Sequence, residues 1–364
     1  MIDLKCSRAL LRAIALLVVL CSAEICNAQE GPRPAVLDQP AMLNQHATKS
    51  VLLGVTRAGA RLVVVGERGL VLLSDDDGNH WQQAKVPVGV ALTAVQFVDD
   101  QQGWAVGHQG VVLHTVDGGQ TWEKQLDGVQ VAELYRAAAE QGSGPQNGQR
   151  VKEAEQLVAD GPDKPFLDVL FSDSRNGFVA GAYNLLLRTS DGGKTWQPWS
   201  WHVDNPQSYH FNSLLSADGA LYIAGERGLL LRSRDGAQSF QKLSLPYEGS
   251  LFGIAASRHG ELVAFGLRGA AFWSADRGDT WQRISTQVDS SFSAAVPLAN
   301  GALLLATQAG ELLVNAPGSE HFERVAGTCG AATAAVAISP SGSVVVAGPN
   351  GVFRECAGAL SSAR

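Results

Sequence analysis

The sequence predicts an all-β fold, a seven-bladed β-propeller with a helical hairpin insertion between blades two and three. Three features predict it: a motif that ends in tryptophan and recurs along the chain, a Gly-x-x-Gly element upstream of each copy, and a nearly constant distance between copies. A repeat of about 40 residues that contains four short strands is typical of a propeller blade. The 364 residues are enough for one propeller and little else.

The tryptophan-ended motif is expected to form the turn between the third and fourth strands of each blade. Its aspartate can hydrogen-bond the backbone that follows, its glycines accept a positive φ, and its tryptophan can pack between neighbouring blades. We therefore interpret the motif as a structural turn and not as a site. The copies are Ser74–Trp81, Thr115–Trp122, Thr189–Trp196 and Ser274–Trp281, with looser ones at 233–240 and 315–322.

The Gly-x-x-Gly element is expected to join the second strand of each blade to the third. Its first residue lies at positions 66, 107, 181, 225, 266, 307 and 348. Five of the six distances between these positions are 41 or 44 residues, and the remaining one is 74. The long distance places one inserted segment between blades two and three.

The inserted segment spans about 127–164 and contains two stretches in which apolar residues recur with helical spacing. The first is Val129–Gln141 and the second is Gln149–Asp160, with the glycine-containing stretch 142–148 between them. We expect these stretches to form a helical hairpin that leans over one face of the propeller.

The last repeat ends at Val352–Cys356 and lacks a fourth strand of its own. We expect Ala35–Ala41 to supply that strand, because a closed ring has no free sheet edge. Cys329 and Cys356 flank this repeat, and in an exported protein such a pair predicts a disulfide. Two free buried thiols are the alternative.

Residues 1–28 read as a signal peptide, which leaves 29–364 as a single propeller. Basic residues precede the apolar run Ala13–Leu20, and the small residues around Ala28 resemble a cleavage site. The apolar run is too short for a membrane-spanning helix. We expect an exported protein of the periplasm, or of the thylakoid lumen in a photosynthetic host. A lipidated Cys21 or Cys26 is the less favoured alternative, because bulky residues precede both.

The turns between second and third strands should lie on one face, together with the links between blades. Their side chains would then form a ring around one mouth of the central channel. The formal net charge of −7 gives no support to nucleic-acid binding. The turn residues are Glu67, Arg68, His108, Gln109, Tyr183, Glu226, Arg227, Leu267 and Arg268.

Arg68, Arg227 and Arg268 come from three separate blades and suit the recognition of a carboxylate or another anion. The alternative is local, since Glu67 and Glu226 adjoin two of these arginines and could pair with them. The histidines are scattered and the cysteines lack zinc-site spacing, so we predict no metal and no cofactor.

The motif Thr-x-Asp-Gly-Gly-x-Thr-Trp resembles that of the Asp-box (BNR) repeat proteins. The longer unit from Trp104 and Gly107 through Trp122, and the related Asn176–Gly181, are similar to the photosystem II stability/assembly factor family. This resemblance implies an exported, non-enzymatic scaffold, peripheral to a membrane at most. It further implies that basic residues on one propeller face bind a membrane-protein complex or its precursor subunits.

Two other functions are compatible with the sequence. One is a periplasmic accessory protein of a transport or cell-surface system in a non-photosynthetic bacterium. The other is an Asp-box glycosidase of the sialidase type, which needs an arginine triad, an acid/base carboxylate and a tyrosine nucleophile beside a glutamate. Both turn glutamates adjoin arginines, and no tyrosine has an evident glutamate base. We therefore expect no enzymatic activity.

Overall fold

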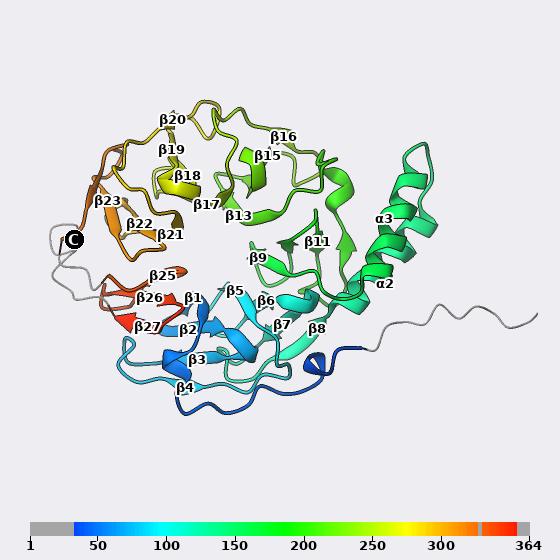
Figure 1. Cartoon of the computed structure of the whole chain (residues 1–364), viewed down its shortest axis with the longest axis horizontal. Coiled ribbons are helices and arrows are strands. Elements are labelled where there is room, and N and C mark those ends of the chain that lie inside the picture. Colours follow the sequence, from blue (N-terminus) through cyan, green and yellow to red (C-terminus); the bar gives the residue numbers. More distant parts are fainter. Residues whose placement is uncertain (1–32, 327–329, 355–364) are drawn as a thin grey trace, which may run out of the picture. The chain divides into compact units, whose positions relative to one another are not determined.

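Seven small antiparallel sheets follow one another along the chain, and Figure 1 shows them arranged as a ring around a central opening. The structure is a computed structural model that describes residues 33–326 and 330–354. The residues from Ala35 onward form one unit, to which the description below applies. The predicted seven-bladed β-propeller is therefore confirmed.

The first four blades each contain four strands in sequential order. Blade one consists of β1 (Leu52–Ala58), β2 (Arg61–Gly66), β3 (Val71–Ser74) and β4 (Gln82–Gln83). Blade two consists of β5 (Leu92–Phe97), β6 (Gly103–Gly107), β7 (Val112–Thr115) and β8 (Glu123–Leu126). Blade three consists of β9 (Phe166–Phe171), β10 (Gly177–Gly181), β11 (Leu186–Thr189) and β12 (Gln197–Pro198). Blade four consists of β13 (Phe211–Ala217), β14 (Ala220–Gly225), β15 (Leu230–Ser233) and β16 (Gln241–Lys242).

The last three blades complete the ring. Blade five consists of β17 (Leu251–Ala256), β18 (Leu262–Gly266), β19 (Ala271–Ser274) and β20 (Gln282–Arg283). Blade six consists of β21 (Phe292–Pro297), β22 (Leu303–Thr307), β23 (Leu312–Asn315) and β24 (Phe322–Arg324). Blade seven shows three strands within the described residues, namely β25 (Ala335–Ile338), β26 (Val344–Gly348) and β27 (Gly351–Arg354).

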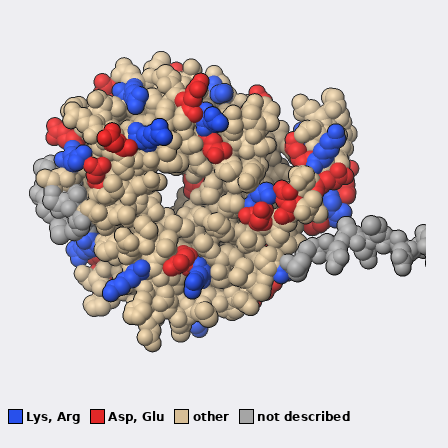
Figure 2. All heavy atoms as spheres, viewed as in Figure 1, with Lys and Arg blue, Asp and Glu red and all other residues tan. Residues whose placement is uncertain are grey.

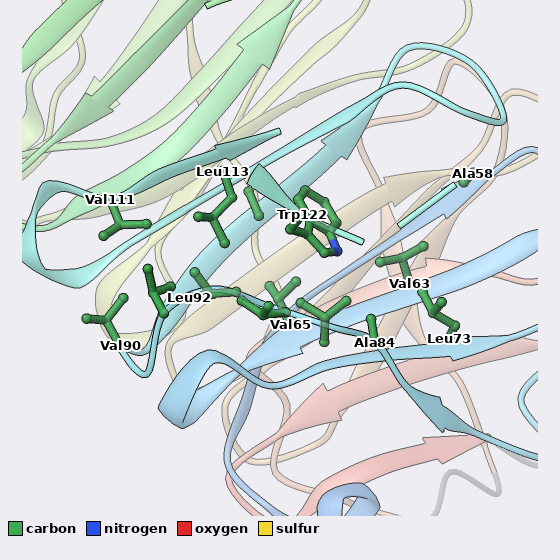
Figure 3. Packing of buried hydrophobic residues seen from close by; sticks show 14 of the residues in the cluster. Ala58, Val63, Val65, Leu73, Ala84, Val90, Leu92, Val111, Leu113 and Trp122 are labelled. Carbon is green, nitrogen blue, oxygen red and sulfur yellow. The ribbon is translucent and has the colours of Figure 1, made fainter. Parts of the chain in front are cut away.

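The hydrophobic core lies between neighbouring blades and not within single ones. Figure 3 shows one such interface, where Leu73 and Ala84 of blade one meet Leu92, Leu113 and Trp122 of blade two. Each of these side chains is at most 8% exposed. Burial of a large apolar side chain contributes about 2–3 kcal/mol, so each interface supplies a substantial part of the folding free energy.

The tryptophan-ended motifs form the turns between third and fourth strands, and one hydrogen-bond pattern recurs in them. In the blade-three turn, Asp191 accepts bonds from the Thr189 hydroxyl at 2.8 Å and from the Thr195 amide at 2.9 Å. The Thr195 hydroxyl donates to the second carboxylate oxygen at 2.6 Å. These bonds, first the one from the Thr195 hydroxyl, lower the pKa of Asp191 to about 2.

The ring closes differently from the sequence expectation, and the prediction of a fourth strand from Ala35–Ala41 was wrong. Residues Ala35–Leu37 form the short 3-10 helix η1. The amide of Gly89 donates to the Val36 carbonyl at 2.8 Å, and the amide of Ala41 donates to the Val86 carbonyl at 3.0 Å. These bonds hold the segment against the link between blades one and two, where the side chain of Leu37 is fully buried.

A second 3-10 helix, η2 (Ala47–Lys49), lies against β27 of blade seven instead. Its Ala47 belongs to the same apolar cluster as Val352 and Leu52. The junction between blades seven and one is thus covered by a helical turn and by packing. The cysteines 329 and 356 and the residues 1–28 lie outside the described residues, so the disulfide and the signal peptide stay predictions.

The insertion between blades two and three is a helical hairpin, as predicted. It consists of α2 (Gly128–Gln141) and α3 (Asn147–Asp160), and a capping box between Asp127 and Gln130 begins α2. Figure 1 shows the hairpin at the outer side of the ring beside blade three, and not over one face of the propeller as we expected from the sequence. Neither helix, nor any other in the described part of the chain, has the length and apolar character needed to cross a membrane.

One buried tyrosine explains the position of the hairpin. The hydroxyl of Tyr135 in α2 is 3.2 Å from the carbonyl of Leu186 and 3.0 Å from the hydroxyl of Ser200, both in blade three or the link that follows it. Burial raises the pKa of Tyr135 to about 12. The hydroxyl thus stays protonated and fastens α2 to the outer part of the blade.

The aspartate of the tryptophan-ended turns, represented by Asp191, should make the stability of the fold depend on pH in acid. Its pKa is about 2 in the folded chain, whereas an unfolded aspartate titrates near a pH of about 3.9. Its stabilising contribution is therefore complete above the unfolded value and is lost as the pH falls through the folded one. Because the carboxylate lies at the surface, the contribution is about 1 kcal/mol or less. We expect Asp191→Asn to lower the free energy of unfolding in urea at neutral pH and to reduce its fall in acid.

Asp289→Asn is the matched control for this change. Asp289 is exposed, and no hydrogen bond of its side chain is seen within the described residues. This variant should unfold like the wild type at every pH. An equal effect of both substitutions would show that the turn does not stabilise the fold through its aspartate.

Candidate functional site

The Gly-x-x-Gly turns share one backbone geometry. In four blades the turn is a single 3-10 turn, and in each the residue before the second glycine is left-handed. The φ values are 54° for Arg68, 58° for Gln109, 54° for Arg227 and 53° for Arg268. The turns are η3 (Glu67–Gly69), η4 (His108–Gly110), η6 (Glu226–Gly228) and η7 (Leu267–Gly269).

Glycine is needed at both ends of the turn because backbone from two links approaches it. In blade four, a Cβ on Gly225 would lie 2.3 Å from the carbonyl oxygen of His210, in the link that enters the blade. A Cβ on Gly228 would lie 2.0 Å from the carbonyl oxygen of Tyr247, in the link that leaves it. The Gly228 amide also donates to the Gly249 carbonyl at 2.8 Å. The turn is therefore held between both links, and its left-handed residue, Arg227, is exposed.

The two turn glutamates bind backbone and not the neighbouring arginines. The amide of Val51 donates to Glu67 at 3.2 Å, and the amide of His210 donates to Glu226 at 3.0 Å. Both bonds hold the link that enters the blade. Within the described residues, Arg68, Arg227 and Arg268 take part in no ion pair, and all three side chains are exposed. The local Glu–Arg pairing considered from the sequence is thus not what the structure shows.

The three arginines are not equally close to one another around the ring. Arg227 and Arg268 occupy equivalent turns of blades four and five, which are neighbours, whereas Arg68 belongs to blade one across the ring (Figure 1). The structure thus brings two of the three predicted arginines into adjacent turns. In the view of Figure 2, acidic and basic side chains alternate around the ring and do not form a patch of one sign.

A cavity of about 530 Å³ lies beside Arg227, between the turn of blade four and the link to blade five. The hydroxyl of Tyr247 in this link donates to the Leu267 carbonyl of the next turn at 3.1 Å. Sequence reasoning missed this cavity, because its walls come mostly from links that vary between repeats. The aromatic residues in two successive links were the available signal. The polar lining consists of Gln207, Tyr209, Arg227, Lys242, Ser244, Tyr247 and Glu248.

Tyr183 and His210 connect the turns of blades three and four on the same face. Tyr183 is 58% exposed, and its ring centroid lies 4.7 Å from that of His210. Lys164 places its ammonium 5.1 Å from the Tyr183 ring centroid, and His210 Nδ1 lies 3.8 Å from a carboxylate oxygen of Glu226. His108 is exposed in the turn of blade two and does not join this group.

Trp199 and Trp201, in the link after blade three, pack against other parts of the protein and do not line the face. Trp199 donates its indole N–H to the Ala237 carbonyl at 2.7 Å and stacks on His202 with centroids 4.1 Å apart. Trp201 meets Tyr135 edge to face at 5.5 Å. Within the described residues, no group of histidine, cysteine and acidic side chains is arranged to hold a metal ion.

Comparison with known proteins shows which family this chain belongs to. A family model, Photosynthesis system II assembly factor YCF48, matches residues 73–139 and 149–326, more than half of the chain. The chain belongs to this family. The resemblance to photosystem II stability/assembly factors seen in the repeats is thus confirmed.

Two curated relatives show how far the sequence similarity extends. The Photosystem II assembly lipoprotein Ycf48 of Synechococcus sp. (strain CC9902) is 25% identical over 138 residues, which cover 37% of this chain and 32% of that protein. The chloroplastic Photosystem II stability/assembly factor HCF136 of Cyanidioschyzon merolae (strain NIES-3377 / 10D) is 33% identical over 85 residues, covering 23% and 18%. The matched stretches thus span a third or less of these relatives.

Solved structures extend the similarity of fold to nearly the whole propeller. A structure of YCF48 bound to D1 peptide has a TM-score of 0.62 and 17% identity, and covers 87% of this chain and 95% of that one. The GH74 xyloglucanase from Xanthomonas campestris has a TM-score of 0.57 and 12% identity, and covers 85% and 52%. At such identities the structures share the fold with this chain, and the fold alone does not distinguish binding from catalysis.

The close approach at Gly228 gives a test of the turn geometry. Both Gly228 and Gly219 have a positive φ, 69° and 76°, but a Cβ on Gly219 would meet nothing within 4 Å. Gly219→Ala should therefore cost only the left-handed strain, about 1–2 kcal/mol. Gly228→Ala must also displace the link at Tyr247, so we expect a clearly larger loss of unfolding free energy in urea. Equal losses of unfolding free energy in the two variants would contradict the close packing of Gly228 against the link at Tyr247.

Proposed function

We propose that this chain is an exported, non-enzymatic assembly factor that binds an acidic segment of a membrane-protein subunit with the face that carries its Gly-x-x-Gly turns. One observation carries the proposal: the exposed Arg227 lines the cavity of about 530 Å³, and Arg268 is exposed in the equivalent turn of the next blade. Guanidinium groups without a local carboxylate partner are suited to bind a carboxylate of a ligand. Membership in the assembly-factor family supports a membrane-protein client.

The related solved structure of YCF48 bound to D1 peptide supports a peptide as the ligand. An extended peptide fits this face because the turns are rigid and the links between them differ from blade to blade. Arg227, Lys242 and Tyr247 would then contact the peptide first, with Arg268 in the next blade along its path. We place Arg68, His108 and Tyr183 on the same face as additional contacts for a longer segment.

A non-enzymatic role is favoured by the surroundings of the tyrosines. A sialidase-type reaction needs a tyrosine nucleophile in contact with a glutamate. Within the described residues, the bonded tyrosine hydroxyls contact carbonyls or a serine hydroxyl, and none contacts a carboxylate. We accordingly propose binding and not glycoside hydrolysis, although glycosidases share the fold.

Charge reversal on the face tests this function. The double variant Arg227→Glu/Arg268→Glu should weaken binding of an acidic peptide about tenfold or more, because each lost charge-assisted hydrogen bond is worth about 1.5–3 kcal/mol. Arg68→Glu alone should weaken it less, since blade one lies across the ring. Fluorescence anisotropy with an acidic peptide and its glutamine counterpart measures both effects.

Arg258→Glu is the matched control, because Arg258 is an exposed arginine in the loop between β17 and β18, at the other end of the blades. This variant should bind the acidic peptide like the wild type. Unchanged binding by the double variant, with an unchanged melting temperature, would remove Arg227 and Arg268 from the site. In cells, a photo-crosslinker at Leu267 should capture membrane-protein subunits that one at Arg258 does not.

A further inference from the structure

Two positions in each repeat fill the interface with the next blade. One is the residue before the first residue of the tryptophan-ended motif, and the other lies three residues after its final aromatic residue. In three of the six copies of the motif both side chains are apolar and belong to the core clusters. The pairs are Leu73 and Ala84 in blade one, Trp273 and Ile284 in blade five, and Val314 and Val325 in blade six.

In blade two both positions are polar, His114 and Gln125, whereas blades three and four have an arginine at the first position alone, Arg188 and Arg232. Within the described residues, His114 Nε2 and Gln125 Oε1 are buried and have no hydrogen-bond partner. The imidazole stacks on Trp104 with centroids 4.8 Å apart, and the Gln125 amide nitrogen donates to the Gly192 carbonyl at 2.8 Å. Both side chains are thus held in place while one polar atom of each stays unsatisfied, which is energetically unfavourable.

A cavity of about 610 Å³ lies over these two residues, between the outer strands of blade two and the Asp191 turn of blade three. Cavities of about 300–1,000 Å³ are typical of sites for small molecules. The cavity is at the end of the blades opposite the Gly-x-x-Gly turns, because the tryptophan-ended motifs join the third strand to the fourth. It is therefore separate from the site proposed above.

The charged residues around this cavity carry opposite signs but do not pair. Glu123 lies on the blade-two side, and Arg175 and Lys194 lie on the blade-three side. None of the three forms an ion pair in the part of the chain that the structure describes. Asp191, which also lines the cavity, already accepts hydrogen bonds on both oxygens from its own turn. Two cations and one carboxylate thus face a common space from opposite sides.

We propose that this cavity binds a small zwitterion, a free α-amino acid, between blades two and three. Arg175 and Lys194 would hold the carboxylate of the ligand, and Glu123 would hold its ammonium group. A simple anion would leave Glu123 without a partner, and a simple cation would leave the two basic residues without one. A ligand with both charges pairs with both sides of the cavity.

Isothermal titration of the protein with each of the twenty common L-α-amino acids tests the proposal, with acetate and methylammonium as singly charged probes. We expect at least one amino acid to bind and both single ions to bind at least about tenfold more weakly, since each supplies only half of the charge-assisted bonds. Binding of acetate as tight as that of the amino acids would overturn the zwitterion assignment. The absence of binding by all twenty would overturn the site.

Variants of the cavity connect the binding to these residues. Glu123→Gln and Arg175→Gln should each weaken amino-acid binding about tenfold, whereas Arg258→Gln, in the equivalent loop of blade five, should not change it. His114→Leu/Gln125→Ala copies the blade-one interface and should abolish binding while the melting temperature is kept or raised. Wild-type affinity in the Glu123 and Arg175 variants would place the ligand elsewhere. Because the cavity is separate from the peptide-binding face, peptide capture should be unchanged in all of them.

Discussion

The contact of each Gly-x-x-Gly turn with two links between blades is the constraint on which the rest of this structure depends. The turn approaches the link that enters its blade and the link that leaves it so closely that no Cβ fits on either glycine, as at Gly66 and Gly69 in blade one. These close backbone contacts fix the position of each turn between the two links. The left-handed residue of the turn differs between blades, and the exposed arginines occur at this position.

Polar clamps on the innermost strands stabilise the ring from its channel side. Thr93 donates to the Phe166 carbonyl at 2.7 Å, Asn212 to the Leu251 carbonyl at 2.8 Å, and Ser293 to the Thr333 carbonyl at 2.7 Å. Each bond joins one blade to the next, and each donor lies at the irregular position where the innermost strand shifts its register. The propeller is thus held at its turns and at its channel, so the outer links can carry cavities without loosening the ring.

The period of the sequence predicted the blades, the turns and the hairpin, because each depends on residues close together in the chain. The path of Ala35–Ala41 could not be predicted, since it depends on backbone groups of the link at Val86–Gly89 that no pattern reveals. Because Glu67 and Arg68 are neighbours in the chain, the sequence also suggested a local ion pair between them, which the structure does not show within the residues that it describes. The left-handed conformation of the arginine turns its side chain outward while the glutamate folds back onto Val51.

The polar interface between blades two and three needs compensation, and the structure supplies it nearby. Trp104 stacks on Phe171 across the interface with centroids 3.6 Å apart. The side chain of Gln96 accepts from the Phe171 amide at 2.5 Å and donates to its carbonyl at 3.2 Å, a two-way clamp between innermost strands. The hairpin adds the buried contacts of Tyr135 to the same pair of blades. An interface that is strengthened on three sides can therefore keep buried polar atoms of His114, Gln125 and Trp196 that have no hydrogen-bond partner within the described residues.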